Sequence, residues 1–267
     1  MYERQVDFFH QLSGVLLTSQ LTSTDCSSAM WAMARCGYVL DRGVFDFLAE
    51  KLSGMLENAN SRLVARALWA CAKMSVFEEY DSGQDNQPPY MASAQEFLRY
   101  LIANGEQMTP LHISQSVWAV GCLRLSSDPG VVDKMASIAL SKAALCNSQE
   151  IANIVWGLSK VDYDNPKVVS ELVQHITESE SRKGECTPQE ASNILYALGK
   201  LQICDDGAFG KLSSILMNQL QDASSQAIAN ALWAFDAVSL EPPIELMGTW
   251  AREKLGVASV LDNATEF

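Results

Sequence analysis

Six aromatic residues recur along this chain at a spacing close to 38 residues, and this spacing constrains the fold more than any other feature. They are Trp31, Trp69, Trp118, Trp156, Tyr196 and Trp233, at intervals of 38, 49, 38, 40 and 37 residues. The long interval exceeds the period by 11, and Glu79 to Pro89 (EYDSGQDNQPP) supplies 11 residues of loop-type composition. Self-similarity at a fixed period of this length is typical of repeat architectures.

Each aromatic residue lies in a segment with the apolar periodicity of an amphipathic helix, as in IANIVWGLSKV and IANALWAFDAV. The predicted N-terminal capping residues are Thr24 or Asp25, Ser61, Thr109, Ser148, Thr187 and Ser224. A short loop and a second amphipathic run follow, predicted at Val44–Leu56, Ala92–Ala103, Val131–Ala144, Pro166–Thr177, Ala208–Leu220 and Pro243–Leu255. One helical hairpin cannot bury its own apolar face, but stacked hairpins can. The sequence therefore predicts an all-α fold, an α-solenoid of about six 38-residue helix-turn-helix repeats.

We expect one helical-repeat array through residues 1–267. The predicted repeats are 22–60, 61–108, 109–147, 148–186, 187–223 and 224–260, with a partial repeat at 1–21. Residues 1–20 resemble the second helix of an earlier repeat, and the chain stops about where another first helix would begin. We therefore expect the chain to be an excerpt of a longer array.

Several function classes find no support in the sequence. There is no Gly-rich phosphate loop, no His-Glu-x-x-His and no Gly-x-Ser-x-Gly, so we do not expect an enzyme. Three scattered histidines and seven cysteines without a Cys-x-x-Cys spacing predict neither a metal site nor a cofactor. The cysteines are expected to be buried, reduced thiols. No apolar run of about 18 residues is present, so no membrane span is expected, and no targeting peptide is visible at the N-terminus.

A polar stripe emerges when each first helix is numbered from its aromatic residue. Positions −5, −4, −1, 0, +2 and +3 are mostly apolar and are expected to form the core, with the aromatic residue packed inside it. Positions −7, −3, +1 and +4 are related by steps of three and four and are expected to share another face. They hold 24 residues, of which six are basic and none is acidic. Chance at the overall composition would give about 1.7 basic and about 2.9 acidic residues.

This stripe predicts single-stranded RNA as the ligand. Amide side chains donate to and accept from base edges, and basic side chains meet phosphates. Polar side chains that recur once per repeat are how helical-repeat proteins read single-stranded RNA. The candidate RNA-binding residues are Arg35, Arg62, Arg66, Lys73, Gln115, Gln149, Asn153, Lys160, Gln189, Asn193, Lys200, Gln226 and Asn230.

Other interpretations remain open. The net charge is −13, which weighs against a general nucleic-acid binder. The asparagines could instead bridge adjacent helices, and a lysine near a helix C-terminus is favourable without any ligand. The predicted stripe also has few aromatic residues on which bases could stack. The alternative function is a protein-binding scaffold of the same solenoid shape that makes no direct RNA contact.

The segments IANIVWGLSK, ASNILYALGK and IANALWAFDA resemble the octotricopeptide repeats of algal organellar proteins and the related heptatricopeptide, RAP-associated repeats of apicomplexans. The core Gln-x-x-Ala-Asn-x-Leu-Trp-Ala-Leu of those repeats is matched well by Gln226 to Ala234 and by Gln149 to Leu158. The first repeat departs from it, since Ser28 replaces the asparagine. The chain is also similar to the helical arrays of Fas-activated kinase-like proteins and of the RNA-editing substrate-binding complex.

The resemblance implies RNA binding in a mitochondrion or a chloroplast, with the mitochondrial matrix favoured, on a transcript or ribosomal RNA. It implies a part in transcript stability, processing, editing or ribosomal RNA assembly, within a ribonucleoprotein complex that includes other proteins. Members often end in a small RAP domain with a nuclease-like fold. This chain contains no such segment, so no cleavage activity is inferred.

Overall fold

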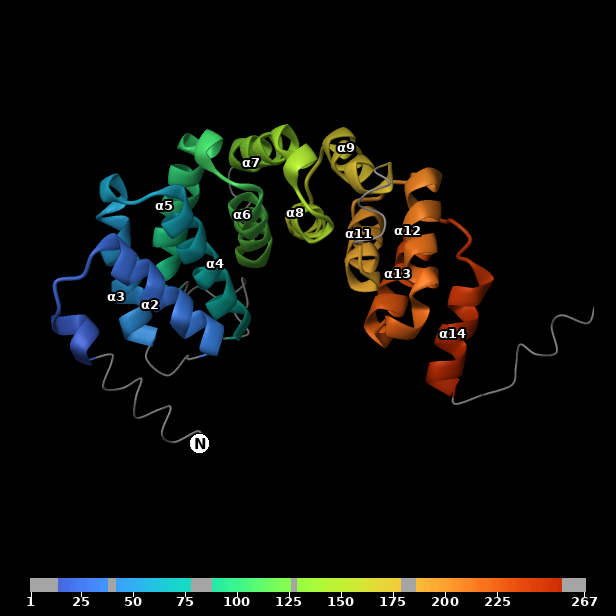
Figure 1. The fold of residues 1–267 in the computed structure, drawn as a ribbon, viewed down its shortest axis with the longest axis horizontal. Coiled ribbons are helices and arrows are strands. Elements are labelled where there is room, and N and C mark those ends of the chain that lie inside the picture. Colours follow the sequence, from blue (N-terminus) through green and yellow to red (C-terminus); the bar gives the residue numbers. More distant parts are fainter. Residues whose placement is uncertain (1–13, 38–41, 78–87, 126–128, 179–185, 256–267) are drawn as a thin grey trace, which may run out of the picture. The chain divides into compact units, whose positions relative to one another are not determined.

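The structure, a computed structural model, describes residues 14–37, 42–77, 88–125, 129–178 and 186–255 (Figure 1). All regular structure in these ranges is helical, and the helices pack against their neighbours in sequence order, which confirms the predicted all-α, solenoid-like fold. The chain divides into two compact units, an N-terminal unit (Met1–Ala139) and a C-terminal unit (Leu140–Phe267). The boundary between the two units falls within the helix α7.

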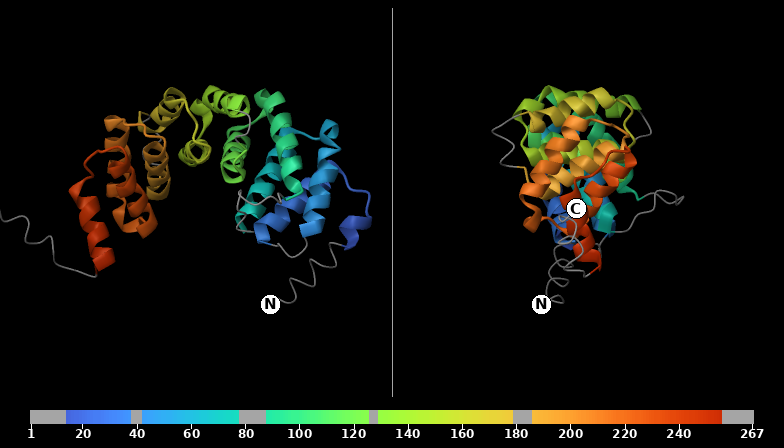
Figure 2. Two further views of the ribbon diagram at one scale, coloured as in Figure 1. Left: turned by 180° about the vertical axis from the view of Figure 1, so that it is seen from behind. Right: turned by 90° about the vertical axis from the view of Figure 1, so that its right-hand side faces the viewer.

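The N-terminal unit stacks its hairpins in two layers. Its first helices are α2 (Ser23–Cys36), α4 (Ser61–Phe77) and α6 (Pro110–Leu123). Its second helices are α3 (Arg42–Ser53), α5 (Tyr90–Ala103) and α7 (Pro129–Ser141). First helices pack on first helices, α2 on α4 and α4 on α6, while α3 packs on α5 in the second layer (Figures 1 and 2).

The C-terminal unit repeats this arrangement. Its first helices are α8 (Ser148–Lys160), α11 (Pro188–Lys200) and α13 (Ser225–Ala237). Its second helices are α9 (Pro166–Thr177), α12 (Asp206–Asn218) and α14 (Ile244–Leu255). Helix α11 lies between α8 and α13, and α9 packs on α12. Because each first helix contacts the next, the residues of one helix position form a column down the unit.

Three of the four second helices that a 3₁₀ turn follows end earlier than predicted, whereas α5 ends at the predicted Ala103. Helix α9 has the predicted bounds, but α3, α7 and α12 each begin two residues earlier and end two or three residues earlier than predicted. The turns are η1 (Leu56–Asn58), η2 (Gly105–Gln107), η3 (Ala143–Leu145) and η4 (Leu220–Asp222). Their tighter winding redirects the chain toward the next first helix within three residues.

Side-chain caps fix where the first helices begin. The predicted caps Thr109, Thr187 and Ser224 are confirmed. The other three predictions were wrong by one to three residues, because the capping residue precedes the first helical residue. Thr22 caps α2, Asn147 caps α8, and the Asn60 side chain accepts the Leu63 N–H of α4.

Acidic residues at position −6 complete reciprocal capping boxes. The Asp25, Glu150 and Glu190 carboxylates accept the backbone N–H of Thr22, Asn147 and Thr187 at 2.9 Å. These carboxylates lie at the positive end of the helix dipole, which stabilises their charge. For Asp25, the Thr22 hydroxyl and backbone N–H hold the pKa below its ordinary value.

In α6 a histidine fills this capping position, and it makes the stability of the N-terminal unit pH-dependent. His112 Nδ1 accepts the Thr109 N–H at 3.4 Å. Burial, and then the charge of Arg62, lower the His112 pKa. The unfolded chain therefore takes up this proton at a higher pH than the folded chain does, so stability is lost as the pH falls below about 6.5.

We expect His112→Gln to keep the cap, because an amide oxygen accepts the same N–H, and to remove this part of the pH dependence. The melting temperature should fall less between pH 7.5 and pH 5 in the variant than in the parent protein. Thermal denaturation followed by circular dichroism measures both values. Equal losses in the two proteins would contradict the assignment.

The prediction that the cysteines are buried thiols is confirmed for some of them only. Cys26, Cys71, Cys146 and Cys186 are buried free thiols, but Cys36 and Cys204 are exposed. Burial raises the pKa of Cys26 to about 11 and that of Cys186 to about 12, which keeps both protonated and unreactive. Within the described residues, no helix is long and apolar enough to cross a membrane.

Candidate nucleic-acid interface

The predicted polar positions −7, −3 and +4 reach the surface of the first helices. All six side chains at −7 are exposed, including Arg62, Gln149, Gln189 and Gln226. All six at −3 are half-buried; those predicted to bind are Arg66, Gln115, Asn153, Asn193 and Asn230. At +4, Arg35 is exposed, whereas Lys73, Lys160 and Lys200 are half-buried. These three columns therefore offer side chains to a ligand within each unit.

The aromatic column was placed wrongly by the sequence prediction. Trp233 is 44% exposed, and the other five aromatic residues are half-buried rather than in the core. Five of the six residues at +1, predicted to lie on the stripe, are instead buried, as Ala70, Ala119 and Ala197 show, and the sixth, Ala32, is half-buried. At about 100° per residue, positions −7, −3, 0 and +4 lie within an arc of about 60°, and +1 lies outside it. We call these four columns the first-helix face.

The small residues at +1 serve helix packing. A Cβ atom added to Gly199, at +3 of α11, would lie 2.8 Å from Ala234 Cα, at +1 of α13. Two first helices that approach this closely leave no room for a longer side chain at either position. Small residues at +1 thus let successive first helices meet, rather than letting a ligand approach.

In the N-terminal unit, cations lie against the aromatic column. The Arg66 guanidinium is 5.1 Å from the centre of the Trp31 ring, and the Lys73 ammonium is 5.9 Å from that of Trp118. The Trp69 and Trp118 rings are 6.4 Å apart between centres. A cation within about 6 Å of a ring face is attracted by the π electrons. The basic and aromatic columns therefore form one surface.

The C-terminal unit has the same combination. The Lys160 ammonium lies 4.8 Å from the Trp156 ring centre and 5.3 Å from that of Tyr196, so it contacts the rings of two successive repeats. Tyr196 and Trp233 have ring centres 4.9 Å apart and planes inclined by 35°. Partly exposed rings beside a cation combine an aromatic surface, on which bases can stack, with a positive charge.

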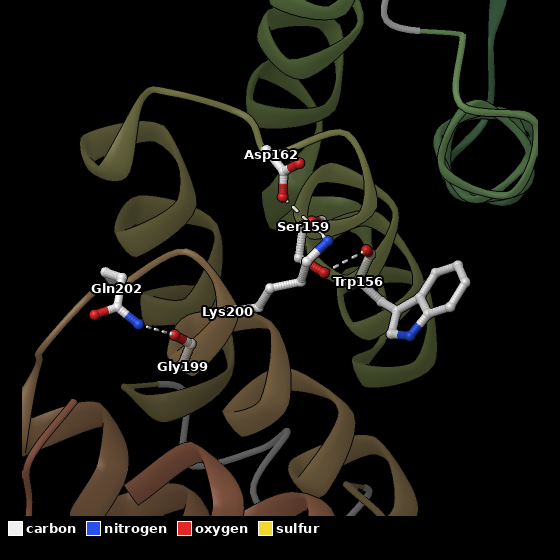
Figure 3. A network of polar contacts seen from close by, with 6 residues as sticks. All are labelled: Trp156, Ser159, Asp162, Gly199, Lys200 and Gln202. Carbon is white, nitrogen blue, oxygen red and sulfur yellow. Dashed lines mark hydrogen bonds and ion pairs between the residues drawn. The ribbon is translucent and has the colours of Figure 1, made fainter. Parts of the chain in front are cut away.

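Within the part of the chain that the structure describes, Lys200 differs from the other predicted cations because it makes both a hydrogen bond and an ion pair. Its Nζ donates to the Ser159 carbonyl at 2.7 Å and pairs with the Asp162 carboxylate at 3.1 Å (Figure 3). The Ser159 carbonyl belongs to the last turn of α8, where carbonyls lack partners within the helix. Lys200 thus ties α11 to the end of α8. We leave it out of the phosphate-binding set.

We expect Lys200→Met to lower the free energy of unfolding by about 1–2 kcal/mol, because it removes a charge-assisted hydrogen bond. Among the described residues, the Ser159 carbonyl then keeps only the backbone N–H of Asp162, at 3.4 Å. Asp162→Asn should cost less than about 0.5 kcal/mol, since Asp162 is 79% exposed and its ion pair is screened by solvent. Urea denaturation of the two variants checks the difference. Equal costs would mean that the ion pair, not the carbonyl contact, carries the effect.

The amide side chains differ in how they are held. Gln189 Nε2 donates to Asn193 Oδ1 at 2.9 Å, and the Ser224 hydroxyl of the next repeat donates to Gln189 Oε1 at 3.2 Å. Gln115 Oε1 is buried without a hydrogen-bond partner among the described residues. One junction between repeats, α11 to α13, therefore has an oriented pair of amides.

Several carboxylates near the first-helix face are engaged in hydrogen bonds or an ion pair, whereas Asp236, at +3 of α13, is exposed. The acids at −6 accept N-cap backbone hydrogen bonds, and Asp162 pairs with Lys200. The four columns of the face contain six basic residues, six aromatic residues and no acid. In the described part of the chain, no group of three His, Cys, Asp or Glu side chains could hold a metal ion. Comparison with protein families found no matching family, and comparison with curated proteins found no significant match.

Proposed function

We propose that this protein binds single-stranded RNA along the first-helix face. The observation that carries the proposal is the aromatic column, which is half-buried to exposed and is lined by cations and amides, on a face whose four columns contain no acid. Unpaired bases stack on aromatic faces, and their edges form hydrogen bonds with amides. Arg35, Arg62, Arg66, Lys73 and Lys160 are the proposed phosphate contacts.

Two features of the sequence weigh against RNA binding, and the composition of the first-helix face accounts for both. The predicted stripe had few aromatic residues for stacking, but the first-helix face carries one in every repeat. The net charge of −13 describes the whole molecule, whereas an RNA strand would meet a local surface that is basic. A face of this composition suits a single strand, because the bases of a duplex are stacked on each other and unavailable to the rings.

The test is binding of a fluorescently labelled pool of single-stranded RNA at 50 mM and 200 mM salt. Five phosphate contacts predict a salt slope of about −3.5, and hence a loss of affinity of about a hundredfold between the two conditions. A duplex of the same length should bind more weakly than the single strand. A protein-binding scaffold predicts no RNA affinity, and that result would contradict the proposal.

The cellular setting follows from the resemblance of the repeats to octotricopeptide and heptatricopeptide proteins. We propose a part in organellar RNA metabolism, with the mitochondrial matrix as the compartment and a transcript or ribosomal RNA as the partner. Microscopy of the full-length, tagged protein beside a mitochondrial marker tests the compartment. Sequencing of RNA that copurifies with the protein identifies the partner.

A further inference from the structure

We propose that the amide pair Gln189 and Asn193 selects a keto base, uracil or guanine, at one position of the bound RNA. This inference rests on the proposed function and names the preference of one repeat. The two residues occupy positions −7 and −3 of α11 and therefore lie on the first-helix face. Gln189 is exposed and Asn193 is half-buried, so a base edge has access to both.

Hydrogen bonds within the protein use up acceptor capacity of both amides. The Ser224 hydroxyl, whose oxygen caps α13 by accepting the Ala227 N–H, donates to Gln189 Oε1. Gln189 Nε2 then donates to Asn193 Oδ1. Each amide oxygen thus already accepts one hydrogen bond. One N–H of Gln189 and both of Asn193 remain to donate, so the pair presents mainly donors to a ligand.

The amide N–H donors distinguish bases by the acceptor and donor atoms at the edge of each base. A free amide suits adenine, because it donates to one edge atom and accepts from another. Here each amide oxygen already accepts one hydrogen bond, which favours the carbonyl oxygens of uracil and guanine over the amino groups of cytosine and adenine. The equivalent pairs Gln149/Asn153 and Gln226/Asn230 show neither bond in the part of the chain that the structure describes.

The aromatic column provides a stacking surface beside this pair. Lys160 contacts the faces of both Trp156 and Tyr196, so the two rings border a common space between α8 and α11. In the N-terminal unit the residue at −3, Arg66, lies over the aromatic ring of the preceding repeat. Asn193 and Trp156 occupy the positions in α11 and α8 that Arg66 and Trp31 occupy in α4 and α2. A base stacked on Trp156 would then present its edge to Asn193.

The test compares uracil with cytosine, which share a ring size and differ at the keto or amino group. Dissociation constants are measured for labelled 12-mers of each at 50 mM salt. We expect the uracil oligonucleotide to bind about tenfold more tightly. Asn193→Asp, which replaces donors with an acceptor of the same shape, should bring the ratio close to one. Gln174→Glu on α9 adds the same charge away from the face and should leave the ratio unchanged.

A second variant, Ser224→Asp, changes a residue that is not a proposed RNA contact. Ser224→Asp keeps a good capping residue but cannot donate to Gln189, so the amide pair loses its fixed orientation and the ratio should fall. Thr187→Asp makes the same kind of change at the cap of α11 and should leave the ratio of the two dissociation constants unchanged. If both oligonucleotides bind and Asn193→Asp leaves the ratio of their dissociation constants unaltered, the inference is overturned. The proposed function is not contradicted by that result. No binding of either oligonucleotide would overturn both.

Discussion

Leucine in place of Trp156, Tyr196 and Trp233 is expected to raise the dissociation constant for single-stranded RNA at least about a hundredfold. Base stacking on an aromatic side chain contributes about 1–3 kcal/mol per base, and leucine retains the apolar contact while removing the flat ring. Fluorescence anisotropy of a labelled single strand at 50 mM salt measures the change. The effect is large because one unit loses its whole aromatic column.

Two controls separate lost binding from lost folding. Circular dichroism and the melting temperature should show a folded variant, since these three rings are half-buried or exposed rather than in the core. The matched variant Trp31→Leu, Trp69→Leu, Trp118→Leu makes the same change in the N-terminal unit and should weaken binding as well. A folded variant of either kind with affinity within twofold of the parent would show that the rings do not contact RNA.

The closest helix contact is expected to be the most sensitive to added volume. Gly199→Ala should lower the free energy of unfolding by about 1–3 kcal/mol, although alanine is the better helix former. The added methyl would lie 2.8 Å from Ala234 Cα and 3.1 Å from its carbonyl oxygen. These are backbone atoms, which move only if α13 shifts against α11.

Gly210→Ala is the matched control for this substitution. Gly210 lies within α12, and nothing lies within 4 Å of a Cβ added there. Alanine should therefore stabilise the protein by about 0.5–1 kcal/mol through its helix propensity alone. Chemical denaturation of both variants gives the two signs. A stabilising Gly199→Ala would mean that α11 and α13 are packed less closely than described.

Local patterns in the sequence were enough to predict the helices. The 38-residue aromatic spacing and the apolar periodicity predicted the order of first and second helices, and Pro166–Thr177 matches α9 residue for residue. Caps such as Thr109 and Thr187 were also predictable, because a hydroxyl before a proline at the first helical position is a local signal. The 3₁₀ turns were missed because nothing in their composition separates them from the last turn of a helix.

The sequence predicted correctly that positions −7, −3 and +4 of the candidate site reach the surface, but it assigned positions 0 and +1 to the wrong faces. The reason lies in the geometry of a helix. From position −3, a step of three leads to the aromatic residue and a step of four leads to +1, and periodicity alone does not choose between them. Hydrophobicity favoured a buried tryptophan, but the contact of Gly199 with Ala234 requires a small residue at +1 and leaves the ring at the edge of the core. The role of Lys200 depends on a carbonyl 41 residues away in sequence, which no local pattern reveals.

Ultraviolet cross-linking to single-stranded RNA tests whether RNA bases contact the first-helix face. The cross-linked residues are mapped by mass spectrometry. Photochemical cross-links form where a base lies against a side chain. We expect cross-links at the aromatic column of the first helices, with Trp156, Tyr196 and Trp233 among them, and few on the second helices. Cross-links confined to the second helices or the loops, or none under conditions in which RNA is bound, would contradict it.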